Sequence, residues 1–298
     1  MNVSPDRLSE VSVRRVRRAG VTARRWPAHG SGQGPTVVFL AGAALGSPFW
    51  EQVRPLVPGS HVLVDRQGRL GTRCDRLPAL DTQAALLARL LEDLSEGPDD
   101  APQVLVAHSM AAFEAEALAR RRPDLVDGLV LVDPSLAIEP ALPSPLEIGA
   151  VGGRGPLAAL CLRAVRTLMR APAVAPAAAR VARAALASEA REPELMRSPA
   201  WQDTWRPNAL VGGVAESLAY SAQRRDLLRL RATTPSLQVP CVLLQAPPYG
   251  SERSMAPLRG AFARLTVHQV EDSGHLMALD APEDVALAVR GLLERLGA

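Results

Sequence analysis

The sequence predicts an α/β fold with a doubly wound, mostly parallel sheet and an inserted helical cap. Apolar runs with the length and composition of buried strands recur along the chain, at residues 35–40, 61–65, 103–107, 129–133, 240–244 and 265–270. Between the third and fourth runs, residues 111–122 alternate apolar and polar positions at helical spacing, which makes a βαβ unit with an expected right-handed crossover. A length of 298 residues suits one α/β domain with insertions.

The first elements are expected to be a hairpin and two strands. The arginines at residues 14–25 are best explained as the solvated face of an N-terminal hairpin with a glycine near its turn. Residues 35–40 form a buried strand that leads into the small residues 41–44. Residues 61–65 form another strand, and we interpret the loop at 66–71 that follows it as a turn that needs glycine flexibility.

A serine stands where the strand at 103–107 turns into a helix. A serine at the tip of a strand-to-helix turn is forced into a strained backbone conformation, and only very small side chains two residues before and after it leave room for the turn. Ala107 and Ala111 occupy those two positions around Ser109. This pattern is typical of a nucleophile elbow, which makes Ser109 the candidate nucleophile.

These motifs resemble those of the α/β-hydrolase family. Its members often show a strand, then small-His-Ser-Met-small, a helix, and an apolar strand that ends in Asp-Pro, as residues 129–134 do here. The resemblance implies that Ser109 attacks the substrate and that His275, which follows the last strand before a helix at 285–296, is the base. His108, beside the nucleophile, is usually structural in the family.

The resemblance also implies an oxyanion hole formed by two backbone N–H groups. Carried over to this chain, the donors are Ala43, after the strand at 35–40, and Met110, directly after the nucleophile. Ala41 stands where the family commonly has histidine, and alanine replaces glycine on both sides of the elbow. Because the donors are backbone groups, the change at position 41 need not abolish the hole.

The carboxylate of a catalytic triad has no obvious place in this sequence. The family's usual position falls on Tyr249, and a neutral phenol cannot stabilise an imidazolium as a carboxylate does. Asp133, at the end of the preceding strand, is the preferred replacement, because some α/β-hydrolases place the acid there. Glu252 is the alternative acid, and a Ser–His dyad or a degraded site stays open.

An all-helical segment interrupts the alternation of strands and helices. Residues 138–230 are expected to form a cap or lid over the nucleophile, between a first core part at 1–137 and a second at 231–298. The aromatic residues in the cap are the candidates for contact with substrate, although packing of the cap on the core explains them nearly as well. They are Trp201, Trp205 and Tyr220.

Composition excludes several other classes of protein. The net charge is +3, and the basic residues are all arginines scattered among 31 acidic ones without interleaved aromatics, so nucleic-acid binding is not expected. Neither a CxxC nor an HExxH spacing occurs, which leaves a metal site without support. No signal peptide or membrane span is indicated, and we expect a cytoplasmic protein that needs no cofactor.

Together these features favour a serine hydrolase that acts on an uncharged, largely apolar ester, thioester, lactone or related acyl substrate. Haloalkane dehalogenase and epoxide hydrolase activities are disfavoured, since relatives with those activities carry aspartate where Ser109 stands. The main alternative is a non-catalytic protein that binds a small molecule and retains the fold.

Overall fold

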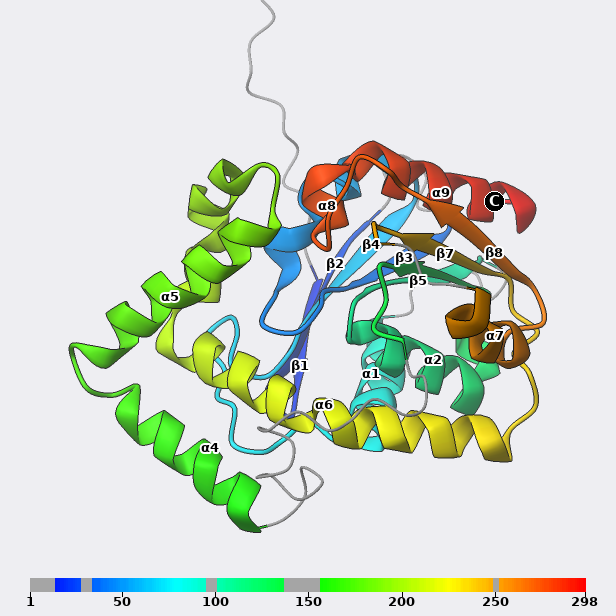
Figure 1. Ribbon diagram of the computed structural model, residues 1–298. Coiled ribbons are helices and arrows are strands. Elements are labelled where there is room, and N and C mark those ends of the chain that lie inside the picture. The colour runs from blue at the N-terminus through cyan, green and yellow to red at the C-terminus, as the bar shows by residue number, and fades with distance from the viewer. Residues whose placement is uncertain (1–13, 28–33, 95–100, 137–155, 249–251) are drawn as a thin grey trace, which may run out of the picture.

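A computed structural model describes residues 14–27, 34–94, 101–136, 156–248 and 252–298. Within these residues, eight strands form one sheet in the order β1-β2-β4-β3-β5-β6-β7-β8 (Figure 1). The strands are β1 (Arg14–Arg18), β2 (Val21–Trp26), β3 (Thr36–Leu40), β4 (Ser60–Asp65), β5 (Gln103–His108), β6 (Gly128–Val132), β7 (Cys241–Gln245) and β8 (Leu265–Gln269). The six strands from β3 to β8 pair in parallel with one another, whereas β2 pairs antiparallel with β1 and with β4.

Helices cover both faces of this sheet (Figure 1). They are α1 (Leu80–Leu94), α2 (Ala111–Arg121), α4 (Pro156–Leu168), α5 (Val174–Glu189), α6 (Pro207–Thr233), α7 (Glu252–Ala261), α8 (Met277–Asp280) and α9 (Pro282–Arg295). Alternate residues of β3 face opposite sides: Val38 and Leu40 pack with α1 and α2, while Val37 and Phe39 pack with α9. Among the described helices, none combines the length and hydropathy that a bilayer crossing requires.

The predicted fold class is confirmed, with additional helices. Each predicted strand is present with ends that shift by at most two residues, and the N-terminal hairpin turns at Gly20, whose φ is +83°. Helix α1 is an element that the sequence analysis does not anticipate. It packs against α2 on one face of the sheet. It is the helix that connects β4 to β5, so the alternation of strands and helices begins before β5.

The helical segment lies between β6 and β7, where the cap is expected. It contains α4, α5, two 3₁₀ helices (η5, Pro193–Arg197, and η6, Pro199–Trp205) and α6. Figure 1 shows α4 and α5 standing off from the sheet, whereas α6 runs past α1 and α2. Helix α6 also packs against α1 and α2, so it belongs to the core as well as to the insertion, and the expected boundary at residue 230 falls inside it.

The carboxyl ends of the parallel strands meet at one edge of the sheet. The segments that follow β3, β5, β6 and β8 carry Ala43, Ser109, Asp133 and His275, respectively. In open α/β sheets ligands bind outside this edge, because the loops there converge from neighbouring strands. The topology therefore gathers these four predicted residues from distant parts of the sequence.

Candidate active site

Ser109 lies at a strained turn between β5 and α2. Its φ is +53°, a conformation that costs a residue other than glycine about 1–3 kcal/mol. The turn is held on both sides: the Ser109 N–H donates to the Val132 carbonyl at 3.1 Å, and the Ala112 N–H donates to the Ser109 carbonyl at 3.1 Å. Ser109 is 8% exposed, so the residue is almost completely buried.

Two hydrogen bonds connect Ser109, His275 and Asp133. The distance between Ser109 Oγ and His275 Nε2 is 3.1 Å, and that between His275 Nδ1 and Asp133 Oδ2 is 2.5 Å. Because a carboxylate only accepts, the ring proton belongs on Nδ1, which leaves Nε2 free to accept the hydroxyl proton of the serine. This is the geometry of a nucleophile, a general base and an orienting acid.

Asp133 is fixed by its backbone and by its second carboxylate oxygen. Its φ is +38°, its N–H donates to the Leu244 carbonyl at 2.8 Å, and its Oδ1 accepts the Ala246 N–H at 3.0 Å. Of the alternatives, Glu252 is the first residue of α7, and its side chain lies outside the part of the chain that the structure describes. Tyr249 lies outside it too.

Hydrogen bonding sets the protonation of His275. The bond to Asp133 raises the pKa of His275, and this effect exceeds the lowering by partial burial; the charges of Asp133 and Glu189 add to the rise. His108 is different, because complete burial and the neighbouring His275 hold its pKa well below the usual range. The neutral His108 ring donates from Nε2 to the His275 carbonyl at 2.7 Å and so fixes the base to the elbow.

The loop at residues 41–44 lies directly against the nucleophile. A Cβ added to Gly42 would come within 2.6 Å of His108 Nδ1 and 3.0 Å of the Ser109 Cβ, so only glycine permits this approach. Met110 caps α2, and the first N–H groups of a helix have no partner within the helix. The two predicted oxyanion donors, Ala43 and Met110, thus flank Ser109 from the loop and from the helix.

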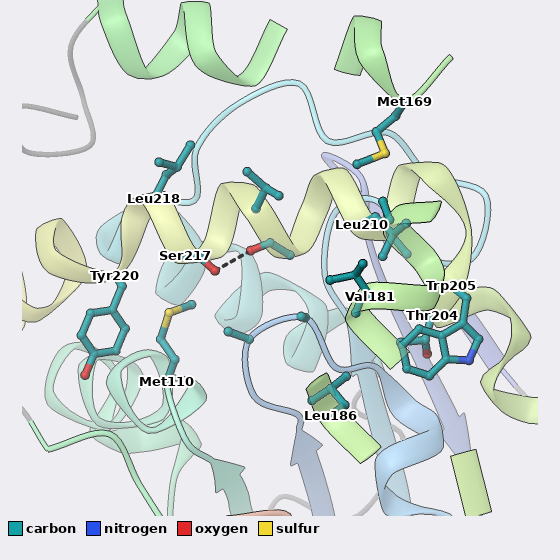
Figure 2. Close-up of a pocket in the computed structure, with 17 residues that line it drawn as sticks. Met110, Met169, Val181, Leu186, Thr204, Trp205, Leu210, Ser217, Leu218 and Tyr220 are labelled. Atoms are coloured by element: carbon teal, nitrogen blue, oxygen red, sulfur yellow. Dashed lines mark hydrogen bonds between the residues drawn. The ribbon is translucent and has the colours of Figure 1, made fainter. Parts of the chain in front are cut away.

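Ala43 and Met110 both line a cavity of about 900 Å³ that runs along α6 (Figure 2). Figure 2 shows Met110 and Tyr220 at one end and Thr204 and Trp205 at the other. No described residue that lines the cavity is charged. Trp205 and Tyr220, both predicted to contact substrate, are among the lining residues.

The structure places Trp201 elsewhere. It is 2% exposed, packs in the core and stacks on Trp205 with ring centroids 6.1 Å apart, so it supports the cavity wall from behind.

Among the described residues, no three histidine, cysteine, aspartate or glutamate side chains are grouped so that they could hold a metal ion.

The sequence analysis misses the charged side chains behind the loop at 41–44. Arg66, in the loop interpreted only as a turn, donates from Nη1 to the Gly42 carbonyl at 3.1 Å. Glu216 accepts the Ala44 N–H at 2.7 Å. The one signal for it in the sequence is a single acidic residue within the small and apolar stretch of α6 from Leu210 to Tyr220.

Comparisons with known proteins concern the family and the fold of the chain. A sequence model of the alpha/beta hydrolase family matches residues 37–289, from β3 into α9. The structure of wild-type Cfl2 from Burkholderia cenocepacia is similar over 94% of this chain and 95% of that chain, with 25% identity and a TM-score of 0.71. Haloalkane dehalogenase DbeA from Bradyrhizobium elkani USDA94 is 23% identical with a TM-score of 0.65, over 96% of this chain and 98% of that one.

The epoxide hydrolase CorEH is 17% identical with a TM-score of 0.67, over 96% of this chain and 99% of that chain. No curated protein matches the chain in sequence. The family match covers the sheet from the second residue of β3 onward and all of the strand ends described above. The chain therefore belongs to the alpha/beta hydrolase family.

Proposed function

We propose that the protein is a serine hydrolase that cleaves uncharged, largely apolar acyl substrates through an acyl-enzyme. One observation carries this proposal: the continuous hydrogen-bonded path from Ser109 Oγ through His275 to Asp133. A nucleophile, a base and an acid in this order are what acyl transfer needs, because the base takes the proton of the nucleophile while the ionised carboxylate stabilises the imidazolium that forms.

In the proposed mechanism, Ser109 Oγ attacks the substrate carbonyl while His275 Nε2 takes its proton. Asp133 stabilises the resulting imidazolium and keeps the ring in the correct tautomer. The N–H groups of Ala43 and Met110 donate to the oxyanion. His275 then gives the proton to the leaving group, and a water activated by the same nitrogen hydrolyses the acyl-enzyme.

The cavity supports the proposed substrate class. Its lining offers hydrogen-bonding side chains mainly at Thr204, Ser217 and Tyr220, and the Ser217 hydroxyl already donates to the Gly213 carbonyl at 3.0 Å. A charged substrate group would lose its hydration there without gaining an oppositely charged partner, which costs several kcal/mol. An apolar acyl chain or alcohol loses little and gains burial.

Two structural neighbours are described as a haloalkane dehalogenase and an epoxide hydrolase. We do not assign these activities to this chain, because attack at a saturated carbon by Ser109 would leave an ether. A histidine-activated water does not cleave an ether, whereas it does cleave the ester that an attacking carboxylate leaves. A serine at the elbow is therefore suited to carbonyl substrates.

A series of p-nitrophenyl esters tests the proposal. We expect turnover of butyrate and octanoate esters and poor turnover of a hemisuccinate ester, whose free carboxylate would be buried without a partner. Ser109→Ala should abolish this turnover. Ser135→Ala is the matched control, because its Oγ lies 3.5 Å from Ser109 Oγ, and it should keep turnover within about threefold.

If no ester is turned over by the wild type, and apolar esters nevertheless bind, the alternative of a non-catalytic binding protein is supported instead. Equal turnover of the hemisuccinate and butyrate esters would leave the hydrolase but overturn the substrate class. Activity that survives Ser109→Ala would overturn the assignment of the nucleophile.

A further inference from the structure

Two arginines and two glutamates form a buried cluster behind the loop at residues 41–44. We call it the ion cluster; it consists of Arg66, Arg69, Glu114 and Glu216. Arg66 Nε donates to both oxygens of Glu114, at 3.2 and 3.1 Å. Arg69 donates to both oxygens of Glu216, at 3.0 and 3.2 Å, and Arg66 Nη1 lies 3.7 Å from Glu216 Oε1. None of the four side chains is more than 7% exposed.

Stability alone does not account for the ion cluster. Removing a charged group from water costs several kcal/mol, and apolar residues of similar volume are often as stabilising as a buried ion pair. The four residues come from three separate segments, namely the loop after β4, helix α2 and helix α6. The ion cluster therefore fixes the relative positions of these segments, and its contacts with the backbone indicate what that fixing achieves.

Both backbone contacts fall on the loop at 41–44. Arg66 Nη1 donates to the Gly42 carbonyl at 3.1 Å, and the Ala44 N–H donates to Glu216 Oε2 at 2.7 Å. The loop is a tight turn in which the Leu45 N–H donates to the Gly42 carbonyl at 3.2 Å. Ala44 has a φ of +59°, which is unfavourable for alanine, so the turn needs support from outside itself.

The Gly42 carbonyl and the Ala43 N–H belong to the same planar peptide unit. Because the peptide is rigid, a bond that fixes the carbonyl oxygen also fixes the direction of the N–H on its other side. A guanidinium on that oxygen also polarises the peptide and makes its N–H a stronger donor. The bond from Ala44 to Glu216 fixes the next peptide and keeps the Ala44 N–H from competing for the substrate.

Glu216 is charged in this setting. Burial by itself would raise the pKa of Glu216, but Arg69 and Arg66 outweigh it and hold the pKa below the ordinary value. Its charge is therefore present at neutral pH, where it attracts the Ala44 N–H more strongly than a neutral acceptor would. Glu216 also stands on α6 between Gly213 and Tyr220, which line the cavity.

We propose that Arg66 and Glu216 are positioning residues that hold the Ala43 N–H in the orientation that stabilises the oxyanion. Helix α6 thus has two roles: it lines the cavity, and through Glu216 it fixes the loop at 41–44. The inference rests on the proposed function, since it assigns these residues a role in that same acyl transfer. Neither side chain is expected to touch the reacting atoms.

The test removes both members of one buried ion pair, so that neither is left as an unpaired buried charge. Arg66→Met with Glu114→Met removes the bond to the Gly42 carbonyl. Its control is Arg231→Met, which removes an ion-pair partner of Glu116 between α6 and α2 that does not contact the loop, while Glu116 keeps Arg120 at 2.9 Å. Both variants are compared with the wild type by thermal unfolding and by kcat/KM for p-nitrophenyl butyrate.

We expect the Arg66 double variant to fold and to lose about 10- to 100-fold in kcat/KM, since a misaligned oxyanion donor loses part of its effect. The control should stay within about threefold of the wild type. Binding of the intact ester, measured in a Ser109→Ala background, should not change. Affinity for butylboronic acid, whose tetrahedral adduct occupies the oxyanion hole, should fall with kcat/KM, while the pH midpoint of His275 stays in place.

Equal kcat/KM for the Arg66 double variant and the control would overturn the inference, as would loss of ester binding that accounts for the whole fall. If the double variant does not fold, Glu216→Gln decides: a decrease in boronic acid affinity without a change in ester binding supports the inference, and no decrease overturns it. A wild type without hydrolysis would overturn the proposed function and this inference together, whereas an active wild type with an unaffected variant overturns only the inference.

Discussion

Asp133 performs two tasks with its two carboxylate oxygens. Oδ1 accepts the Ala246 N–H, which fixes the side chain to the end of β7, and Oδ2 accepts the proton on His275 Nδ1. The carboxylate thus orients the imidazole from a position that is itself anchored. A single residue joins the ends of two neighbouring strands to the base.

Substitution of this residue tests its role. Asp133→Asn should preserve the fold, because the amide oxygen can still accept the Ala246 N–H, but it favours the wrong tautomer of His275. We expect kcat for an ester to fall by about three to four orders of magnitude. Glu252→Gln, measured in parallel, should change kcat less than about twofold. Large losses from Glu252→Gln and small ones from Asp133→Asn would move the acid to Glu252.

The pH dependence follows from the protonation of His275. The base must be neutral to accept the Ser109 proton, so kcat/KM should fall as the pH drops through the pKa of His275. Asp133 raises that pKa, which places the midpoint above the ordinary value of about 6.5. In Asp133→Asn the midpoint should move to lower pH. A pH–rate profile of kcat/KM for both proteins checks the direction, and a midpoint that does not move would contradict this account of the raised pKa.

At the scale of elements, the close approach of the loop at 41–44 to the elbow is the sharpest constraint. A Cβ added to Gly42 would lie 2.6 Å from His108 Nδ1, so Gly42→Ala must push the loop away from Ser109. Because the displaced loop carries the Ala43 N–H with it, we expect kcat/KM to fall about 10- to 100-fold. Crowding should also lower the free energy of unfolding by about 1–3 kcal/mol.

The matched control for this substitution is Gly291→Ala. Gly291 lies inside α9, and a Cβ there meets nothing within 4 Å. Alanine should therefore raise the free energy of unfolding by about 0.5–1 kcal/mol through helix propensity, with kcat/KM unchanged. Denaturant unfolding and ester kinetics on both variants separate crowding at the elbow from a general effect of alanine. Full activity in Gly42→Ala would mean that the loop position does not matter.

The strands are the elements that the sequence predicts well. Their apolar runs are short, rich in β-branched residues and bounded by turns, so each can be identified without its neighbours. Helix α1 is absent from the prediction, although Leu80, Leu87 and Leu94 lie at helical spacing on one buried face. The order of the strands in the sheet depends on pairing between distant segments, which no single strand encodes.

The candidate site divides in the same way. Ser109 and His275 stand in recognisable local motifs, so their pattern alone singles them out. The choice between Asp133 and Glu252 depends on a backbone φ of +38° and a contact across two strands, which a pattern does not contain. The partners of Arg66 are 48 and 150 residues further along, at Glu114 and Glu216, so sequence alone indicates only a turn there.

At the scale of the whole molecule, the helical segment between β6 and β7 has two parts. Within the described residues, α5 has no buried residue and stands off from the sheet, whereas α6 buries Glu216 and Gln223 against the core. Gln223 Nε2 donates to the Pro78 carbonyl at 2.7 Å. We infer that α5 only shapes the cavity, whereas α6 both lines the cavity and is needed for folding.

Two excisions test this division. Replacing residues 156–189 by a flexible linker should leave a folded protein, because little buried apolar surface is lost. It removes Val181 and Leu186 from the cavity wall, so the preference among acyl chain lengths should weaken. Excising residues 138–230 removes α6 as well and should prevent folding. Circular dichroism and a p-nitrophenyl ester series are the measurements; an unchanged chain-length preference in the shorter excision would contradict this view of the cavity.

The central claim is that Ser109 is a nucleophile activated by His275 and Asp133. The most direct measurement is labelling with a small alkyl fluorophosphonate, followed by mass spectrometry of the peptide that carries the label. The account predicts rapid, stoichiometric modification of Ser109, loss of labelling in Ser109→Ala, and much slower labelling in His275→Ala. Labelling of a different serine, or a wild type that the reagent leaves unmodified, would contradict it.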